Sequence, residues 1–253
     1  MGDRLEGKVA IVTGGSRGIG KGIAKRFAEE GAKVMITSRK AESCEAACKE
    51  IGRNVDFEAG HIGRQEDMER VIRATSERLG GLDILVNNAA TNPYAGPTID
   101  VDRPRWDKTL EINLTAPMFW TQAVWHAGMK ETGGSILNIS SVGGFGTNPI
   151  LGVYDVTKAA LVHLTKQLAA EMGPTVRVNA LAPGLIKTDF AKVLWEGERG
   201  TQVAEAYPLK RLGEPGDVAN AALYFADDQA SGWVTGQTLI LDGGGSISFA
   251  RVG

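Results

Sequence analysis

The chain has 253 residues, 43% of them hydrophobic, and a formal net charge of −2 with acids and bases mixed along its length. This size and composition suit one sizeable core, and we expect a single domain over residues 1–253. The charge offers no basic surface for a nucleic acid, and no apolar run approaches the roughly 18 residues of a membrane span. The first residues lack the apolar segment of a signal peptide, so we expect a cytoplasmic protein.

Cysteine and histidine do not predict a metal site. Cys44 and Cys48 lie one helical turn apart, which fits a disulfide, half of a metal site or two thiols on a helix surface. The last is the simplest interpretation for a protein in a reducing compartment. His61, His126 and His163 show no ligand spacing, so we expect no metal.

In chain order, short apolar runs rich in β-branched residues alternate with stretches of helical periodicity. The predicted strands are residues 8–13, 33–37, 55–59, 82–86, 135–139, 176–180 and 238–241. The predicted helices are residues 19–30, 42–51, 66–79, 104–130 with an interruption near Pro117, 154–172 and 217–225. This alternation predicts an α/β fold, a Rossmann-type doubly wound parallel sheet of about seven strands with helices on both faces.

The loop after the first strand, residues 13–20, has the sequence TGGSRGIG and leads into a helix. Gly14, Gly18 and Gly20 would allow a tight turn, close approach of a pyrophosphate and close helix–strand packing. The free amides of the helix N-terminus would then face the phosphates. Glycines often serve only as turns, but their position between a buried strand and a helix favours phosphate binding. In such sheets ligands lie beyond the carboxyl ends of the strands, so the later loops should complete the site.

Tyr154 and Lys158 stand four residues apart on a predicted helix, which places both side chains on one face. A nearby ammonium would stabilise the phenolate and lower the Tyr154 pKa from its ordinary value of about 10. Such a phenol can protonate a carbonyl oxygen or take a proton from an alcohol. Ser140 and Ser141, at the end of the preceding strand, offer a hydroxyl that would hold the same oxygen.

The end of the second strand predicts which cofactor is bound. NAD-binding folds of this kind place Asp or Glu there, to accept hydrogen bonds from the adenosine ribose. Here Ser38 and Arg39 fill the position, and no acid occurs between Gly31 and Ala41. A serine can donate to a 2′-phosphate and an arginine adds a charge-assisted bond, although a solvated basic turn would also explain Arg39. We therefore expect NADP(H), with NADPH preferred over NADH by about tenfold or more.

Together these motifs resemble the short-chain dehydrogenase/reductase family over nearly the whole chain. Residues 13–20 resemble its TGxxxGxG loop, residues 87–90 (NNAA) its NNAG segment, and residues 183–188 (PGLIKT) its PGxIxT motif. Asn113 matches its active-site asparagine. Ser141 lies 13 residues before Tyr154, the usual family spacing, which favours Ser141 over Ser140.

The resemblance implies four catalytic residues: Asn113, Ser141, Tyr154 and Lys158. Tyr154 would exchange the proton and Ser141 would orient the substrate carbonyl. Lys158 would bind the nicotinamide ribose and lower the Tyr154 pKa, and Asn113 would hold a water that links Lys158 to solvent. The implied cofactor-binding residues are Gly14, Ser16, Arg17, Gly18, Ile19, Gly20, Ser38, Arg39, Ile62, Asn88, Ala89, Tyr154, Lys158, Pro183, Gly184, Ile186 and Thr188.

Two positions bear on how ligands would bind. His61 replaces the aspartate that binds the adenine amine in many members, which puts that contact in doubt. Residues 188–212, irregular and mostly helical, lie where the family has its substrate lid. An apolar pocket there would be formed by Phe145, Leu151, Phe190, Val193, Leu194, Trp195 and Tyr207. Packing of the lid or a subunit contact would account equally well for each of these residues taken singly.

The leading hypothesis is an NADPH-dependent reductase of a hydrophobic ketone or aldehyde, resembling the carbonyl- and retinal-reducing branch. The alternative within the family is a 3-oxoacyl-[acyl-carrier-protein] reductase, which would use basic residues to meet an acidic carrier; the turns near Thr132 and at residues 172–175 are nearly uncharged. A non-catalytic NADP(H) sensor is disfavoured because all four catalytic residues are present. The resemblance also implies a homotetramer or, as the alternative, a dimer. The helix predicted over residues 104–130 and the Tyr154 helix would form one interface, and the last strand, with Trp233 and Val234 just before it, would form another.

Overall fold

The computed structural model describes residues 2–248, apart from the side chain of Arg199, and contains one parallel sheet. Its strands are β1 (Val9–Thr13), β2 (Lys33–Thr37), β3 (Val55–Phe57), β4 (Ile84–Asn87), β5 (Gly134–Ile139), β6 (Val176–Pro183) and β7 (Thr238–Leu241). The spatial order is β3-β2-β1-β4-β5-β6-β7, so the direction of winding reverses between β1 and β4. The predicted Rossmann-type sheet is confirmed.

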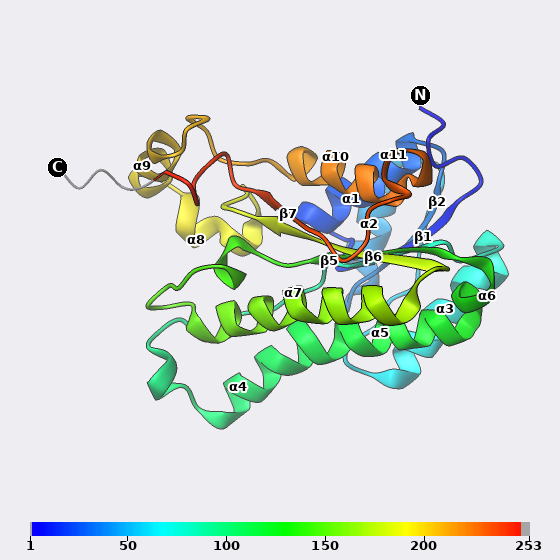
Figure 1. Cartoon of the computed structure of the whole chain (residues 1–253), viewed down its shortest axis with the longest axis horizontal. Helices are drawn as coiled ribbons and strands as arrows, with labels where there is room; N and C mark the ends of the chain where they lie inside the picture. The colour runs from blue at the N-terminus through cyan, green and yellow to red at the C-terminus, as the bar shows by residue number, and fades with distance from the viewer. Residues whose placement is uncertain (1, 249–253) are drawn as a thin grey trace.

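Helices cover both faces of the sheet (Figure 1). One layer contains α1 (Gly18–Glu29), α2 (Ala41–Ile51), α10 (Pro215–Ala226) and α11 (Asp228–Ser231). The other contains α3 (Gln65–Leu79), α4 (Arg103–Leu110), α5 (Ala116–Val124), α6 (Lys130–Thr132) and α7 (Gly152–Met172). Two short helices, α8 (Lys192–Trp195) and α9 (Glu198–Ala206), lie at one end of the molecule. Within residues 2–248, no helix is both long and apolar enough to cross a membrane.

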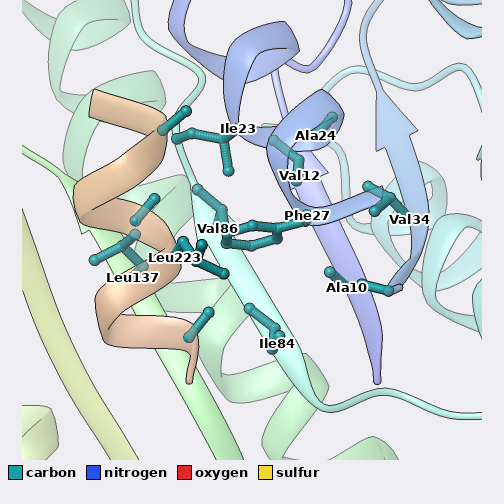
Figure 2. Packing of buried hydrophobic residues seen from close by; sticks show 14 of the residues in the cluster. Ala10, Val12, Ile23, Ala24, Phe27, Val34, Ile84, Val86, Leu137 and Leu223 are labelled. Carbon is teal, nitrogen blue, oxygen red and sulfur yellow. The ribbon is translucent and has the colours of Figure 1, made fainter. Parts of the chain in front are cut away.

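The hydrophobic core has two parts, one on each face of the sheet, because side chains along each strand point alternately to the two faces. In β1, Ala10 and Val12 pack with α1, α2 and α10, whereas Ile11 packs with α3, α5 and α7. Successive side chains of a strand point to opposite faces, so a strand that is apolar throughout needs a helix layer on each side. Figure 2 shows the first cluster, in which Phe27 of α1 and Leu223 of α10 meet the strands.

The helix predicted over residues 104–130 begins at Arg103 and is interrupted next to Pro117, as expected. The interruption is a π-helical segment, η2 (Glu111–Thr115), between α4 and α5. A second π segment, η3 (Trp125–Met129), was not predicted; it contains Gly128, whose φ of 134° is outside the helical range. The described part of the chain also contains three short 3₁₀ segments: η1 (Thr98–Asp100), η4 (Val142–Gly144) and η5 (Asp189–Ala191).

Candidate active site

The glycine loop between β1 and α1 has a backbone that requires glycine at three positions. Gly14 and Gly18 have positive φ angles of 65° and 55°, which side chains rarely adopt. A Cβ on Gly20 would lie 2.4 Å from the carbonyl oxygen of Gly14, so only glycine fits. Arg17 precedes α1 without capping it through its side chain, which leaves the first amides of the helix open. These open amides are compatible with the predicted phosphate site, and phosphate binding stays a prediction.

Asn88 and Ala89 fasten the loop after β4 to this glycine loop. The Asn88 side chain donates to the carbonyl of Thr13 over 2.8 Å, and the main-chain amides of Asn88 and Ala89 donate to the Thr13 hydroxyl over 3.0 and 3.2 Å. The side-chain amide of Asn88 is therefore used within the protein. Asn88 and Ala89 fix the loop after β4 against the glycine loop and do not offer a free polar side chain.

The residues predicted to select NADP(H) over NAD(H) come from the glycine loop and from the segment that follows β2. The Ser16 hydroxyl donates to the Ser38 hydroxyl over 3.0 Å, which joins the glycine loop to β2. Arg17 and Arg39 are exposed, and neither guanidinium has a hydrogen bond or ion pair within residues 2–248. These two hydroxyls and two cations, called here the Ser16–Ser38 corner, are groups that suit the binding of a phosphate.

His61 and Ile62 follow β3, near α4 and α5. His61 Nδ1 accepts from the Gly63 amide over 3.1 Å, and Lys108 Nζ lies 3.4 Å from its Nε2. Burial, followed by the charge of Lys108, lowers the His61 pKa, so the ring is neutral near pH 7. Ile62 packs on the α3–α5 side of the core, and its carbonyl accepts from Trp120 over 2.9 Å. His61 thus cannot replace the charge of an aspartate.

The two serines at the end of β5 have different surroundings. Ser140 is buried, and its hydroxyl donates to the Lys158 carbonyl over 2.9 Å. The Ser141 hydroxyl accepts from the Gly143 amide over 3.1 Å and hydrogen-bonds the Tyr154 side chain. Ser140 therefore secures α7, while Ser141 lies beside the phenol, in agreement with the assignment made from spacing.

Tyr154 and Lys158 lie together as predicted, with Lys158 Nζ 5.4 Å from the centroid of the Tyr154 ring. The expected lowering of the Tyr154 pKa is wrong for this structure: burial of the hydroxyl raises it, the Ser141 hydrogen bond lowers it, and the charge of Asp155 raises it further. Burial also lowers the Lys158 pKa to about 7, and its ammonium donates to the Ile139 carbonyl over 2.7 Å. For both pKa values, the effect of burial thus outweighs the attraction between the phenolate and the ammonium.

Asn113 is completely buried in η2, and its side-chain amide is fully used. Its Oδ1 accepts from the Thr91 amide over 2.8 Å, and its Nδ2 donates to the Thr91 carbonyl over 2.9 Å and the Thr157 hydroxyl over 3.1 Å. The Thr157 hydroxyl in turn donates to the Tyr154 carbonyl over 2.7 Å. Sequence reasoning missed Thr91 and Thr157, although the place of Thr157 between Tyr154 and Lys158 is a signal that could have found it.

Asp155 is a second omission of the sequence reasoning. The residue is 7% exposed, its Oδ2 has no hydrogen-bond partner within residues 2–248, and burial raises its pKa to about 6. The main-chain amide of Asn148 donates to its carboxylate. A Cβ on Gly143 would lie 2.0 Å from its Oδ1, so the carboxylate packs directly against the loop that follows Ser141. The sequence signal that could have identified Asp155 is its position directly after the predicted catalytic residue Tyr154.

The loop after β6 closes the site from the opposite side. The Gly184 amide donates to the Leu241 carbonyl over 2.9 Å, directly after Pro183 ends β6, and Ile186 is buried. The Thr188 hydroxyl accepts from the Ala191 amide over 3.4 Å. A Cβ on Gly18 would lie 3.2 Å from Thr188 Cγ2. The motif therefore reaches the glycine loop, and its cofactor role stays a prediction.

The lid residues divide into two groups. Phe190 is 50% exposed, and the centroid of its ring lies 6.4 Å from that of Tyr154. Trp195 instead donates from its indole nitrogen to the Thr188 carbonyl over 2.9 Å, and the Tyr207 hydroxyl accepts from the Leu185 amide over 3.3 Å. Phe190 is thus placed to meet a ligand at Tyr154, whereas Trp195 and Tyr207 hold the lid to the loop after β6.

Known proteins resemble this chain over almost its full length. A family model described as enoyl-(acyl carrier protein) reductase matches residues 14–246. Human dehydrogenase/reductase SDR family member 4 is 42% identical over 247 residues, which cover 96% of this chain and 88% of that protein. Short-chain dehydrogenase/reductase SDRA of Arabidopsis thaliana is 41% identical over 245 residues, 95% of each chain.

Solved structures agree with the sequence relatives. A short-chain type dehydrogenase/reductase from Mycobacterium ulcerans superposes with a TM-score of 0.90 at 34% identity, covering 96% of this chain and 91% of its own. A single-residue variant of actinorhodin polyketide ketoreductase, solved with NADPH, gives a TM-score of 0.89 at 31% identity over 97% of this chain and 99% of its own. The chain therefore belongs to the short-chain dehydrogenase/reductase family, whose oxidoreductases use a nicotinamide cofactor.

Proposed function

We propose that this protein is an NADPH-dependent reductase of hydrophobic ketones or aldehydes. The observation that carries the proposal is the hydrogen bond between Ser141 and the Tyr154 phenol. Tyr154 lies beside Lys158 on α7, and Asn113 binds Thr157 of the same helix. These groups can orient a carbonyl oxygen and supply a proton to it. A non-catalytic sensor would have no need for this arrangement.

In the proposed reaction a bound nicotinamide supplies the hydride. Ser141 donates a hydrogen bond to the substrate carbonyl, and Tyr154 gives the proton as the alcohol forms. The Lys158 amine, with a pKa of about 7, exchanges protons readily near neutrality and replenishes the site. Reversal of these steps oxidises an alcohol, and the direction in the cell follows from the supply of cofactor.

The preference for NADPH is supported by the corner formed by Ser16, Ser38 and the two exposed arginines. One charge-assisted hydrogen bond contributes roughly 1.5–3 kcal/mol, more than the tenfold preference requires. We expect kcat/KM with NADPH to exceed that with NADH by at least about tenfold. The double variant Ser38→Asp with Arg39→Leu should reverse the preference, with Lys40→Leu as the control. Equal values for both cofactors in the unmodified protein would refute this part of the proposal.

The choice of a hydrophobic substrate is supported by the apolar lid, in which the exposed Phe190 ring lies near Tyr154. The family model, in contrast, is described by an acyl carrier protein substrate, so a 3-oxoacyl-thioester reductase is the second candidate. The test is to follow NADPH oxidation with retinal, bulky diketones, quinones and acetoacetyl carrier protein. A bulky carbonyl should give the highest kcat/KM. A tenfold preference for the carrier-bound thioester would favour the second candidate.

Assembly of several copies of the chain is the last part of the proposal. Trp233 is fully exposed beside β7, and Leu239 and Ile240 of that edge strand are 40% and 38% exposed. These apolar residues support a contact between copies of the chain, within the proposed homotetramer, whereas Val234 is already packed against the core. Light scattering that gives the 26.9 kDa mass of one chain would refute the proposal. A single domain with a lid and a cytoplasmic location remain predictions.

A further inference from the structure

Asp155 follows Tyr154 directly, has no part in the proposed reaction, and yet is buried in the first turn of α7. The helix dipole stabilises a negative charge in this turn, which explains an acid there but not its burial. A buried carboxylate costs free energy unless it has partners, and Asp155 Oδ2 has none within the described residues. The reason for its burial is therefore to be found in what the carboxylate contacts.

The carboxylate lies against the loop between β5 and α7, residues 141–151. This loop contains no charged residue, so its contacts with Asp155 do not include an ion pair. Near the start of the loop, Gly143 packs so closely on Asp155 Oδ1 that a Cβ at residue 143 would overlap with this oxygen. Near its end, the main-chain amide of Asn148 donates a hydrogen bond to the carboxylate. One side chain thus contacts both ends of the loop.

Gly143 connects Asp155 to Ser141. The Gly143 amide donates to the Ser141 hydroxyl over 3.1 Å at the start of η4. The same hydroxyl hydrogen-bonds the Tyr154 side chain. A serine hydroxyl has one proton and two lone pairs, so an amide that donates to one lone pair limits the directions in which the proton can point. The position of Gly143 therefore influences how Ser141 presents its hydroxyl.

The next residue, Gly144, lies against the main chain of α7. A Cβ on Gly144 would lie 3.0 Å from main-chain atoms of Lys158 and Ala159. A contact with main-chain atoms persists when a side chain of α7 is replaced. The contact of Gly143 with Asp155, in contrast, is made by a side chain, so a substitution can remove it without changing the rest of this packing.

We propose that Asp155 is a positioning residue: its carboxylate holds both ends of the loop formed by residues 141–151 on α7 and thereby directs the Ser141 hydroxyl toward the substrate oxygen. The inference rests on the proposed function, because Ser141 acts there on the substrate carbonyl. It goes beyond that function in assigning a task to a side chain that acts through Gly143.

The test is a double-mutant cycle that combines Ser141→Ala with Asp155→Ala or Asp155→Ser, whose side chains are too short to make both contacts. In the parent protein, each short variant should lower kcat about tenfold, with NADPH affinity unchanged. In the Ser141→Ala background the same change should lower kcat less than about twofold, because the hydroxyl through which Asp155 acts is already absent.

Two further variants separate the contact from the charge. Asp155→Asn keeps a side-chain oxygen and the shape of the carboxylate, so kcat should stay within about threefold of the parent value. Glu171→Gln removes an exposed acid from the same helix and should match the parent protein. Asp155→Asn that is as slow as Asp155→Ala would show that the charge and not the contact matters, and would overturn the inference.

Crystal structures provide a readout that does not depend on activity. In the short variants, the distance between the Gly143 amide nitrogen and Ser141 Oγ should exceed about 3.5 Å, the limit of a hydrogen bond. In Asp155→Asn and Glu171→Gln it should stay near 3.1 Å. Alanine suits a helix and removes a buried charge, so Asp155→Ala should fold, which thermal unfolding checks.

The inference is overturned if the short variants match the parent in kcat, or lower kcat by the same factor with and without the Ser141 hydroxyl. It is also overturned if the Gly143 amide keeps its bond to Ser141 in these variants. A parent protein that binds NADPH but reduces no carbonyl would refute the proposed function instead. The crystal structures would still decide whether Asp155 holds the loop.

Discussion

The two sides of the site differ in how firmly the chain holds them. On one side Asn113, Thr157 and Lys158 are 0%, 0% and 2% exposed and are joined by hydrogen bonds to each other or to neighbouring strands. On the other side Phe190 and Val193 are 50% and 80% exposed, and the lid is attached by a few polar contacts. Buried networks fix geometry, whereas exposed loops adapt to a ligand. Substitutions in the first region should therefore change the rate, and substitutions in the second should change substrate affinity.

The largest expected effect is that of Tyr154→Phe. The change removes the hydroxyl beside Ser141 and keeps the ring that packs near Phe190. Loss of a general acid should lower kcat about 10²–10⁴-fold, with NADPH affinity retained. Tyr224→Phe, a half-exposed tyrosine on α10, is the control. Near-normal turnover by Tyr154→Phe would show that the Tyr154 hydroxyl, and the buried region around it, does not set the rate.

The second prediction concerns the cost of burying Lys158. Its pKa is lowered from 10.5 to about 7, so between these values the unfolded chain binds more protons than the folded one. Stability should then rise with pH across this interval, by up to about 1.4 kcal/mol per pH unit from this group. Lys158→Met should remove this dependence and raise Tm most at pH 7 and below.

Thermal unfolding of the cofactor-free protein at pH 6, 7.5 and 9 measures the effect. Lys166→Met is the control, because Lys166 lies on the same helix but is exposed. If the difference in Tm between Lys158→Met and the parent protein were the same at all three pH values, the buried amine would not be the cause.

A smaller effect is expected for Phe190→Ala. Its ring faces Tyr154, so its loss should raise KM for a bulky carbonyl several-fold, about 1 kcal/mol, with little change in kcat. Val193→Ala, at a more exposed lid position, should leave both constants unchanged. Equal effects of the two variants would mean that the lid binds substrate without a specific contact at Phe190.

The smallest effect is expected for Trp195→Phe, which keeps an aromatic ring and removes the N–H bond to the Thr188 carbonyl. A neutral hydrogen bond contributes about 1 kcal/mol, and its loss should loosen the lid for every substrate. KM should therefore rise about equally for small and bulky carbonyls. A selective rise for bulky substrates would instead place Trp195 in the substrate pocket, one of the roles that the sequence left open.

By itself, the sequence determined the parallel sheet and the neighbourhood of Tyr154. The strands at residues 33–37 and 238–241 were predicted with their observed bounds, because an apolar run between turn residues is a local signal. Helical periodicity likewise placed Lys158 beside Tyr154, and the proline in the long helix marked its interruption. These features depend on residues only a few positions apart.

Tertiary structure alone decided which distant groups meet and how deeply they are buried. The Asn113 side chain binds Thr91 and Thr157, which are 22 and 44 residues away. The position of Thr157 between Tyr154 and Lys158 marks it as a site residue, but nothing in the sequence pairs it with Asn113. The direction of the Tyr154 pKa shift depends on how much protein surrounds its hydroxyl, which outweighs the nearby amine. Burial and long-range pairing arise from the order of strands in the sheet, and spacing along the chain does not encode that order.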